Sequence, residues 1–281
     1  MRRLPEGGAI QETAGARLRR RATHLIAHPG AWLRYVWLTE VRHREVRFRE
    51  NPRFLDWRPM FRVARGPLAG LLGVPVETLD GYFAEIGPLH EELLRSVGDL
   101  PSAGALMQAP ILYVLARVAR PNWAIETGIS SGLSARLLVE ALRANGGGHL
   151  DSIGLDEFAL RDPAGSAVAG LGGRRVGWLV PEGFRDLWTL RVGRSDAVLP
   201  ALLTERGEGV DLFLHDSLHQ YATMRWEYEC VLPRIAPGGF LLSHDIHANA
   251  AWPETVARHR LDRSIEADHD LGIAVVPGPA R

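Results

Sequence analysis

The sequence predicts an α/β protein with a doubly wound, mostly parallel sheet and a helical N-terminal extension. From Trp123 onward, short apolar segments alternate with segments of helical period, which is typical of a parallel sheet covered by helices. The chain has 281 residues, of which 46% are hydrophobic and 23% are charged, as in ordinary globular proteins. We therefore expect a tail and helical extension over residues 1–105 and one sheet-containing domain over residues 106–281.

The extension begins with residues 1–21, which are rich in Arg, Gly and Glu and have no clear period, as a tail would be. From His28 to Arg49, aromatic and aliphatic residues recur at roughly helical spacing with Arg between them. Such a helix could lie on a membrane surface, or it could pack on the domain or across a dimer interface. The density of aromatic residues favours packing, so a homo-oligomer formed through these helices is one expectation.

Residues 66–120 also have helical character, and prolines set the expected breaks. We expect helices to stop at Gly87-Pro88, at Pro101 and at Pro110, because proline lacks the N–H that a helix interior needs.

The sheet domain is expected to consist of strands and helices in turn. The expected strands cover residues 123–127, 149–155, 190–192, 210–214, 240–243 and 272–276. The expected helices cover residues 131–144, 197–204, 221–234 and 252–260. Residues 158–186 form a Gly-rich connection, and its Gly165–Gly183 stretch either closes over a bound molecule as a lid or packs on the surface.

Composition excludes several classes of protein. The single cysteine, Cys230, excludes an internal disulfide framework, and no apolar run reaches the roughly 18 residues of a membrane-spanning helix. No apolar signal-peptide region follows Met1, so the cytoplasm is the expected compartment. All 33 basic residues are arginines, which leaves no lysine for a P-loop or a Schiff base.

Charge is unevenly distributed although the formal net charge is zero. Through Arg65 the chain has 15 Arg against 6 acidic residues, and after it 18 Arg against 27 acidic residues. An Arg-rich arm could contact phosphates, yet docking onto the acidic remainder explains the division equally well. Because no base-flipping motif of the Asn/Asp-Pro-Pro-Tyr type is present, we do not expect nucleic acid as a partner.

A glycine-containing loop follows the first expected strand, with the sequence Glu126-Thr-Gly-Ile-Ser-Ser-Gly-Leu-Ser134. Gly128 permits a tight turn, and Gly132 lets a ligand approach the backbone N–H groups at the start of the next helix. The loop is neither a dinucleotide Gly-x-Gly-x-x-Gly motif nor a Walker loop, and by itself it could be a plain glycine turn.

The ends of the next two strands add to this signal. Asp156 follows the second strand, where an acid would accept hydrogen bonds from ribose hydroxyls, although it could instead cap a helix. Gly193-Arg-Ser-Asp196 ends the third strand, where Ser195 or Asp196 could face a base or begin the following helix.

Two further strands end abruptly in Asp and His. Asp216 and His219 follow the strand at 210–214, and His244, Asp245 and His247 follow the strand at 240–243. Because ligands bind at the carboxyl ends of strands in open α/β sheets, we expect one crevice to receive these side chains.

These motifs in this order resemble the class I S-adenosylmethionine-dependent methyltransferases, and most of all their catechol-O-methyltransferase-like and bacterial small-molecule O-methyltransferase branch. The resemblance covers roughly residues 106–277 and implies a seven-stranded Rossmann-like sheet. It implies contacts to S-adenosylmethionine from Glu126, Thr127, Gly128, Ser130, Gly132, Ser134, Asp156, Ser195, Asp196 and His215. It also implies a divalent cation, Mg²⁺ above all, held by Asp216, His244 and Asp245.

Two departures from that branch bear on the metal and the base. His244 stands where the branch usually has an acid, and imidazole suits transition ions better than Mg²⁺. His244 is therefore either a metal ligand or a neutral hydrogen-bond donor. The branch's lysine base is absent, and His219 occupies its place.

The expected chemistry is methyl transfer to a deprotonated hydroxyl. A divalent ion on Asp216 would lower the pKa of that hydroxyl, and His219, with a pKa near neutrality, would take its proton. His215 should point away from Asp216 by strand alternation, although it could flank the adenine. The first hypothesis is metal-assisted O-methylation of a small hydroxylated molecule such as a sugar, an aromatic compound or a natural product. The alternatives are a metal-independent O- or N-methyltransferase using His219, and a scaffold protein with a vestigial cofactor pocket.

Overall fold

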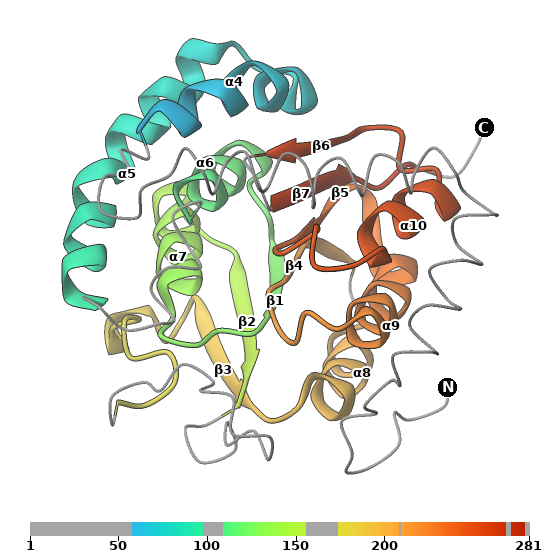
Figure 1. The fold of residues 1–281 in the computed structure, drawn as a ribbon. Helices are drawn as coiled ribbons and strands as arrows, with labels where there is room; N and C mark the ends of the chain where they lie inside the picture. Colours follow the sequence, from blue (N-terminus) through green and yellow to red (C-terminus); the bar gives the residue numbers. More distant parts are fainter. Residues whose placement is uncertain (1–57, 98–108, 156–173, 208, 268–270, 279–281) are drawn as a thin grey trace.

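The computed structural model describes residues 58–97, 109–155, 174–207, 209–267 and 271–278 (Figure 1). The expected tail, the expected helix between His28 and Arg49, and Asp156 lie outside the described residues.

Seven strands form one sheet in the order β3-β2-β1-β4-β5-β7-β6. Their bounds are β1 (Trp123–Thr127), β2 (His149–Gly154), β3 (Trp188–Val192), β4 (Val210–His215), β5 (Ile235–Ser243), β6 (Ser264–Ala267) and β7 (Leu271–Val275). The first five strands pair in parallel, whereas β7 is antiparallel to β5 and to β6. The predicted doubly wound, mostly parallel sheet is confirmed, and its strand order reverses between β1 and β4.

Helices cover both faces of this sheet (Figure 1). One group comprises α4 (Arg58–Leu72), α5 (Val76–Val97), α6 (Ala109–Ala119) and α7 (Leu133–Asn145), with α4 and α5 outermost. The other group comprises α8 (Ser195–Arg206), α9 (Tyr221–Val231) and α10 (Ala251–Arg258). Short 3₁₀ turns, η3 (Glu182–Phe184) and η4 (Leu232–Arg234), complete the described elements.

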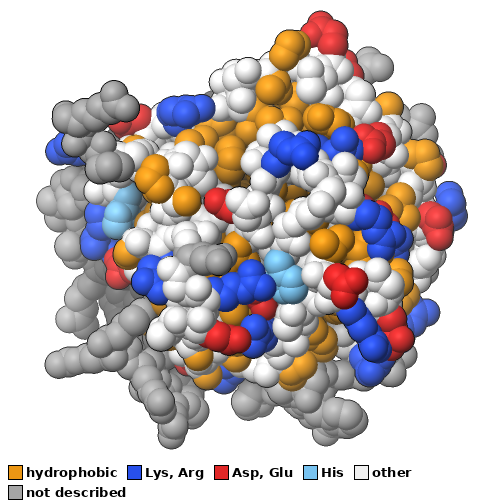
Figure 2. Space-filling view, turned by 180° about the vertical axis from the view of Figure 1, so that it is seen from behind, with side chains coloured by type: hydrophobic (Ala, Val, Ile, Leu, Met, Phe, Trp, Pro, Cys, Tyr) orange, Lys and Arg blue, Asp and Glu red, His pale blue; other side chains and the backbone are white. Residues whose placement is uncertain are grey.

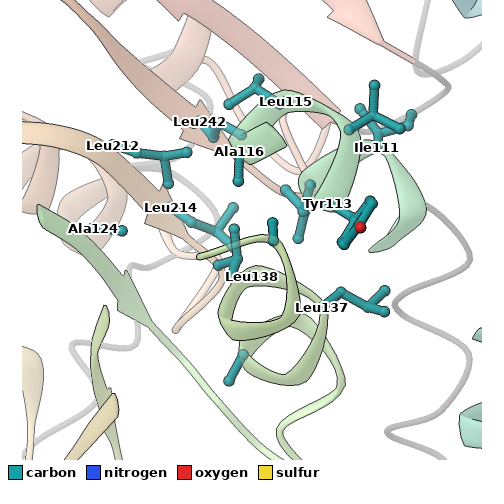
Figure 3. Packing of buried hydrophobic residues seen from close by; sticks show 14 of the residues in the cluster. Ile111, Tyr113, Leu115, Ala116, Ala124, Leu137, Leu138, Leu212, Leu214 and Leu242 are labelled. Atoms are coloured by element: carbon teal, nitrogen blue, oxygen red, sulfur yellow. The ribbon is translucent and has the colours of Figure 1, made fainter. Parts of the chain in front are cut away.

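Strand alternation divides the core between these two helix layers. Ala124 and Leu212 face the layer of α6 and α7, whereas Ile125 and Phe213 face the layer of α8 to α10. This period of two is what a sheet buried on both faces requires. Figure 3 shows the first layer, where α6 and α7 pack their aliphatic side chains against Leu212, Leu214 and Leu242 of the sheet.

Helix α5 corrects one expectation, because it continues through Gly87-Pro88 where a stop was predicted. Leu79, Ile86 and Leu93 lie seven residues apart and are all buried, so one continuous apolar stripe packs along the whole helix. Burial of this stripe outweighs the single backbone hydrogen bond that Pro88 removes.

The other differences are small. Strand β6 was not among the predicted strands, because its sequence Ser-Ile-Glu-Ala gives little apolar signal. Helix α6 begins at Ala109, so Pro110 lies in its first turn, where a proline is tolerated.

Arginines on the domain surface are interspersed with acidic side chains, as the view from behind shows (Figure 2). Arg191 pairs with Asp151 and Glu205, and Arg225 pairs with Glu254. Within the described residues, none of the helices is long and apolar enough to cross a membrane.

Candidate active site

The ends of β1 and β4 meet at the point where the strand order reverses. Thr127 lies opposite His215 in the parallel ladder, and the Asp216 N–H donates to the Thr127 carbonyl at 2.8 Å. Gly128 adopts φ 91°, and a Cβ there would overlap the backbone carbonyl of Asp216. Glycine is therefore required for the two loops to pack backbone against backbone.

Two more residues of the glycine loop adopt the left-handed backbone conformation, Ser130 with φ 46° and Gly132 with φ 89°. Gly132 is the N-cap of α7, so the N–H groups at the start of that helix face the loop, as the sequence predicted. Gly177 and Leu179 donate their N–H groups to the carbonyls of Ser130 and Ser131 at 2.8 and 3.0 Å. The described part of the expected lid thus packs on the glycine loop instead of standing away from it.

Glu126 is buried beneath this loop and accepts hydrogen bonds from Ser134 at 2.8 Å and Ser152 at 2.5 Å. Burial raises the pKa of Glu126 to about 7, although both hydroxyls oppose the shift. The Ser134 hydroxyl, expected to hold the carboxylate of the cofactor, is thus engaged inside the protein.

The end of β3 places Ser195 at the first position of α8. The N-cap itself is Arg194, with no side-chain cap, so neither Ser195 nor Asp196 caps the helix. Asp196 instead accepts two hydrogen bonds from Arg194, at 3.0 and 2.9 Å, and these hold the pKa of Asp196 below its ordinary value.

Four side chains from the ends of β4 and β5 form one cluster. His219 Nδ1 lies 2.7 Å from Asp245 Oδ2, and His219 Nε2 lies 3.4 Å from Asp216 Oδ1. His244 Nδ1 lies 3.3 Å from Asp216 Oδ1 and 3.4 Å from Asp245 Oδ2. The structure therefore brings the predicted residues together, although residues 216–220 precede α9 and are not its first turn.

Asp245 completes the cluster in an unusual backbone conformation, with φ 51°. A non-glycine residue in this left-handed region costs of order 1 kcal/mol, which the surrounding contacts must offset. His247, also expected in this crevice, lies with its Nε2 atom 3.9 Å from Glu266 Oε2.

The cluster couples two imidazoles to two carboxylates. Burial would lower the pKa of both rings, but contacts with Asp216 and Asp245 raise it to about 9 for His219 and about 10 for His244. Burial likewise opposes ionisation of the two acids, yet the histidines hold the pKa of each below its ordinary value. The expectation that the pKa of His219 lies near neutrality is therefore wrong for the ion-free cluster.

The donor set fits a divalent ion. One possible ligand atom each from Asp216, His219 and His244 lies within 4.8 Å of the others. The imidazole nitrogens lie 3.4 and 3.3 Å from Asp216 Oδ1, separations that suit an ion about 2 Å from each atom. His219 Nε2 and His244 Nδ1 are buried without a hydrogen-bond partner in the described part of the chain. Two imidazoles beside carboxylates favour a transition ion over Mg²⁺.

Residues 125–246 match a family model described as a methyltransferase domain. The matched segment begins in β1 and ends just beyond β5, so it contains both the glycine loop and the Asp/His cluster. Over these residues the chain is similar to methyltransferase domains.

Several solved structures are similar to this chain. An O-methyltransferase from Bacillus cereus in complex with SAH is 15% identical, with a TM-score of 0.45, over 70% of this chain and 90% of that one. TomG from Streptomyces achromogenes, an O-methyltransferase involved in tomaymycin synthesis and solved with SAM, is 22% identical, with a TM-score of 0.43, over the same shares. The SAH-bound methyltransferase PaMTH1 from Podospora anserina is 15% identical, with a TM-score of 0.46, over 72% of this chain and 88% of that one. The comparison with curated proteins gave no match.

The candidate site also contains a buried acid that the sequence did not predict. Glu227 of α9 accepts hydrogen bonds from Thr127 at 2.6 Å and from Ser217 at 2.7 Å, and lies 2.6 Å from His215 Nδ1. The available signal was an acid on the apolar face of the helix, one turn from Met224 and beside Tyr228. His215, expected to flank the adenine, is itself fully buried in this network.

Proposed function

We propose that the protein is an O-methyltransferase that acts on a small hydroxylated acceptor and holds a divalent ion at its Asp/His cluster. The observation that carries the proposal is the convergence of Asp216, His219, His244 and Asp245 next to the glycine loop. Asp216 contacts that loop through its own backbone, so a donor bound on the loop would face an acceptor at the cluster.

Asp216, Asp245 and His244 are the proposed ligands of the ion. A bound divalent ion would supply Lewis acidity, which lowers the pKa of an acceptor hydroxyl and helps to orient it. The carboxylates suit hard ions, whereas His244 extends the range to transition ions such as Zn²⁺ or Mn²⁺.

His219 is the proposed base. Asp245 accepts the Nδ1–H of the ring at 2.7 Å, which orients the imidazole and leaves Nε2 to receive the proton of the acceptor. Asn249 helps to position the same residue, because its side chain donates to the His219 carbonyl at 3.2 Å. In this arrangement one side chain holds the ring and another holds its backbone.

A metal-independent O- or N-methyltransferase is the second candidate function. The observation in its favour is that the two carboxylates lie within 3.4 Å of nitrogens of both histidines, so the four side chains can hold one another in place. In that case His219, whose pKa is raised to about 9, would act as the base in its deprotonated form, and the acceptor would approach its Nε2 atom directly.

Transfer of a labelled methyl group from S-adenosylmethionine to hydroxylated sugars, phenols, catechols and amines tests both functions. We expect Asp216→Ala and His219→Ala to lower kcat/KM by about 100-fold or more. The control His259→Ala, an exposed histidine after α10, should leave the rate unchanged. Full activity after chelation would support the metal-independent enzyme, and recovery with added Mg²⁺, Mn²⁺ or Zn²⁺ would identify the ion. No transfer together with no SAH binding would leave only the scaffold interpretation.

A further inference from the structure

Glu227 is a fully buried carboxylate on α9, at the centre of a network that the proposed reaction does not use. Its donors come from several separate segments: Thr127 at the end of β1, His215 and Ser217 around the end of β4, and Ser195 at the start of α8. Burying a carboxylate is costly unless its oxygens are satisfied, and here both are.

Each of these donors is next to a residue of the proposed site. Thr127 precedes Gly128 of the cofactor loop, and His215 and Ser217 flank Asp216 of the cluster. Glu227 therefore lies beneath the backbone contact between Gly128 and Asp216 and holds both sides of it. Side chains of α9 thereby join two loops that are about 90 residues apart in sequence.

Glu227 also orients the ring of His215. Burial opposes ionisation, but the adjacent His215 and the hydroxyl donors hold the pKa of Glu227 below its ordinary value. A charged carboxylate requires a donor, so the Nδ1–H of His215 faces Glu227. That Nε2 atom is buried and has no hydrogen-bond partner among the described residues. The His215 ring meets the His219 ring edge-on, at 5.6 Å between centroids.

We propose that Glu227 is a positioning residue for S-adenosylmethionine: it orients the His215 ring and holds the glycine loop against the Asp216 loop before the cofactor binds. A site that is already ordered loses less conformational freedom on binding, so it binds more tightly. This inference rests on the proposed cofactor site at the glycine loop and adds a residue that does not itself touch the cofactor.

The informative variant is Glu227→Gln, which keeps the size of the side chain but adds an amide donor. The amide has one acceptor oxygen where the carboxylate has two, so at least one of the hydrogen bonds from Thr127, His215 and Ser217 is lost. ¹⁵N NMR of the labelled histidine rings reports the surroundings of His215, and calorimetry with SAH reports cofactor affinity. Glu229→Gln is the matched control, because Glu229 lies on the same helix but pairs with Arg225 at the surface.

We expect E227Q to shift the ¹⁵N signals of the His215 ring, to weaken SAH binding by about tenfold and to raise the KM for S-adenosylmethionine far more than it lowers kcat. E229Q should change none of these. Ser217→Ala removes one donor and keeps the carboxylate, so it should weaken SAH binding about threefold even if E227Q does not fold.

Two other results distinguish a failure of the Glu227 role from a failure of the proposed cofactor site. Wild-type protein that does not bind SAH would remove the cofactor site itself. Wild-type protein that binds SAH, with E227Q folded and S217A both binding it equally tightly, would overturn the positioning role alone. If E227Q does not fold, unchanged SAH binding by S217A overturns that role.

Discussion

Glu126 is a buried acid whose hydrogen bonds, within the described structure, come from the hydroxyls of Ser134 and Ser152. Hydroxyl donors compensate less for lost hydration than a cation would, so burial dominates and the pKa rises to about 7. The protonated acid can itself donate to one of the serines. The folded, cofactor-free protein therefore favours the neutral form of this group.

The stability of the cofactor-free protein should consequently fall as the pH rises through the range from about 4.5 to 7. The folded pKa of Glu126 lies above its unfolded value of 4.5, so the unfolded chain loses the proton first. Above pH 7 this difference amounts to about 3 kcal/mol at most. Glu126→Gln has no such proton, so its free energy of unfolding relative to that of the wild type should increase as the pH rises across this range. Urea unfolding at several pH values measures the difference, and parallel pH profiles would contradict it.

The residues of the cluster were predictable, whereas their state was not. Asp216, His219, His244 and Asp245 stand at strand ends, and strand ends of a parallel sheet meet at one edge whatever the side chains are. The raised pKa of His219 and the Glu227 network arise from contacts across helix and sheet. Such contacts depend on tertiary packing, which has no fixed spacing along the chain.

At the scale of elements, apolar periodicity correctly predicted the parallel strands and their helices. The helix end that we predicted at Gly87-Pro88 was wrong. Helix α5 passes through Pro88 because its buried stripe continues on both sides. Strand β6 escaped notice because it is short and its residues are half-polar. Burial of the whole apolar face of α5 thus outweighed the effect of a single proline on the helix. Strand β6 forms because it pairs with β7, although its own sequence does not indicate a strand.

Replacement of Pro88 by alanine should stabilise the protein by about 1–2 kcal/mol. The change restores an N–H inside α5, and Pro88 is exposed, so its removal leaves no cavity. Greater freedom of the unfolded chain offsets part of the gain. Pro253→Ala is the control, because Pro253 lies in the first turn of α10, where an N–H has no helical acceptor. Thermal unfolding of both variants measures the effect, and equal midpoints would show that Pro88 imposes no cost on α5.

At the scale of the whole molecule, the site exists because the strand order reverses between β1 and β4. The chain winds outward from β1 through β2 and β3, then returns to place β4 on the other side of β1. Helices on opposite faces then diverge from these two strand ends, where the glycine loop and the Asp216 loop meet. The alternation of strands and helices predicted this topology, but the backbone contact that closes it depends on one residue, Gly128.

Gly128→Ala should therefore destabilise the contact between the β1 and β4 loops. Its cost should exceed that of the same substitution at another glycine with a positive φ. A Cβ at Gly128 would overlap the Asp216 backbone, so the β1 and β4 loops would have to separate. Gly146→Ala is the matched control, since Gly146 has a similar φ of 86° and open space around its Cα. The control should cost about 1 kcal/mol from backbone strain alone, whereas Gly128→Ala should cost about 3 kcal/mol or more and weaken SAH binding. Urea unfolding and calorimetry compare the two variants. Equal losses of stability with unchanged SAH affinity would mean that the contact between Gly128 and Asp216 does not hold the site together.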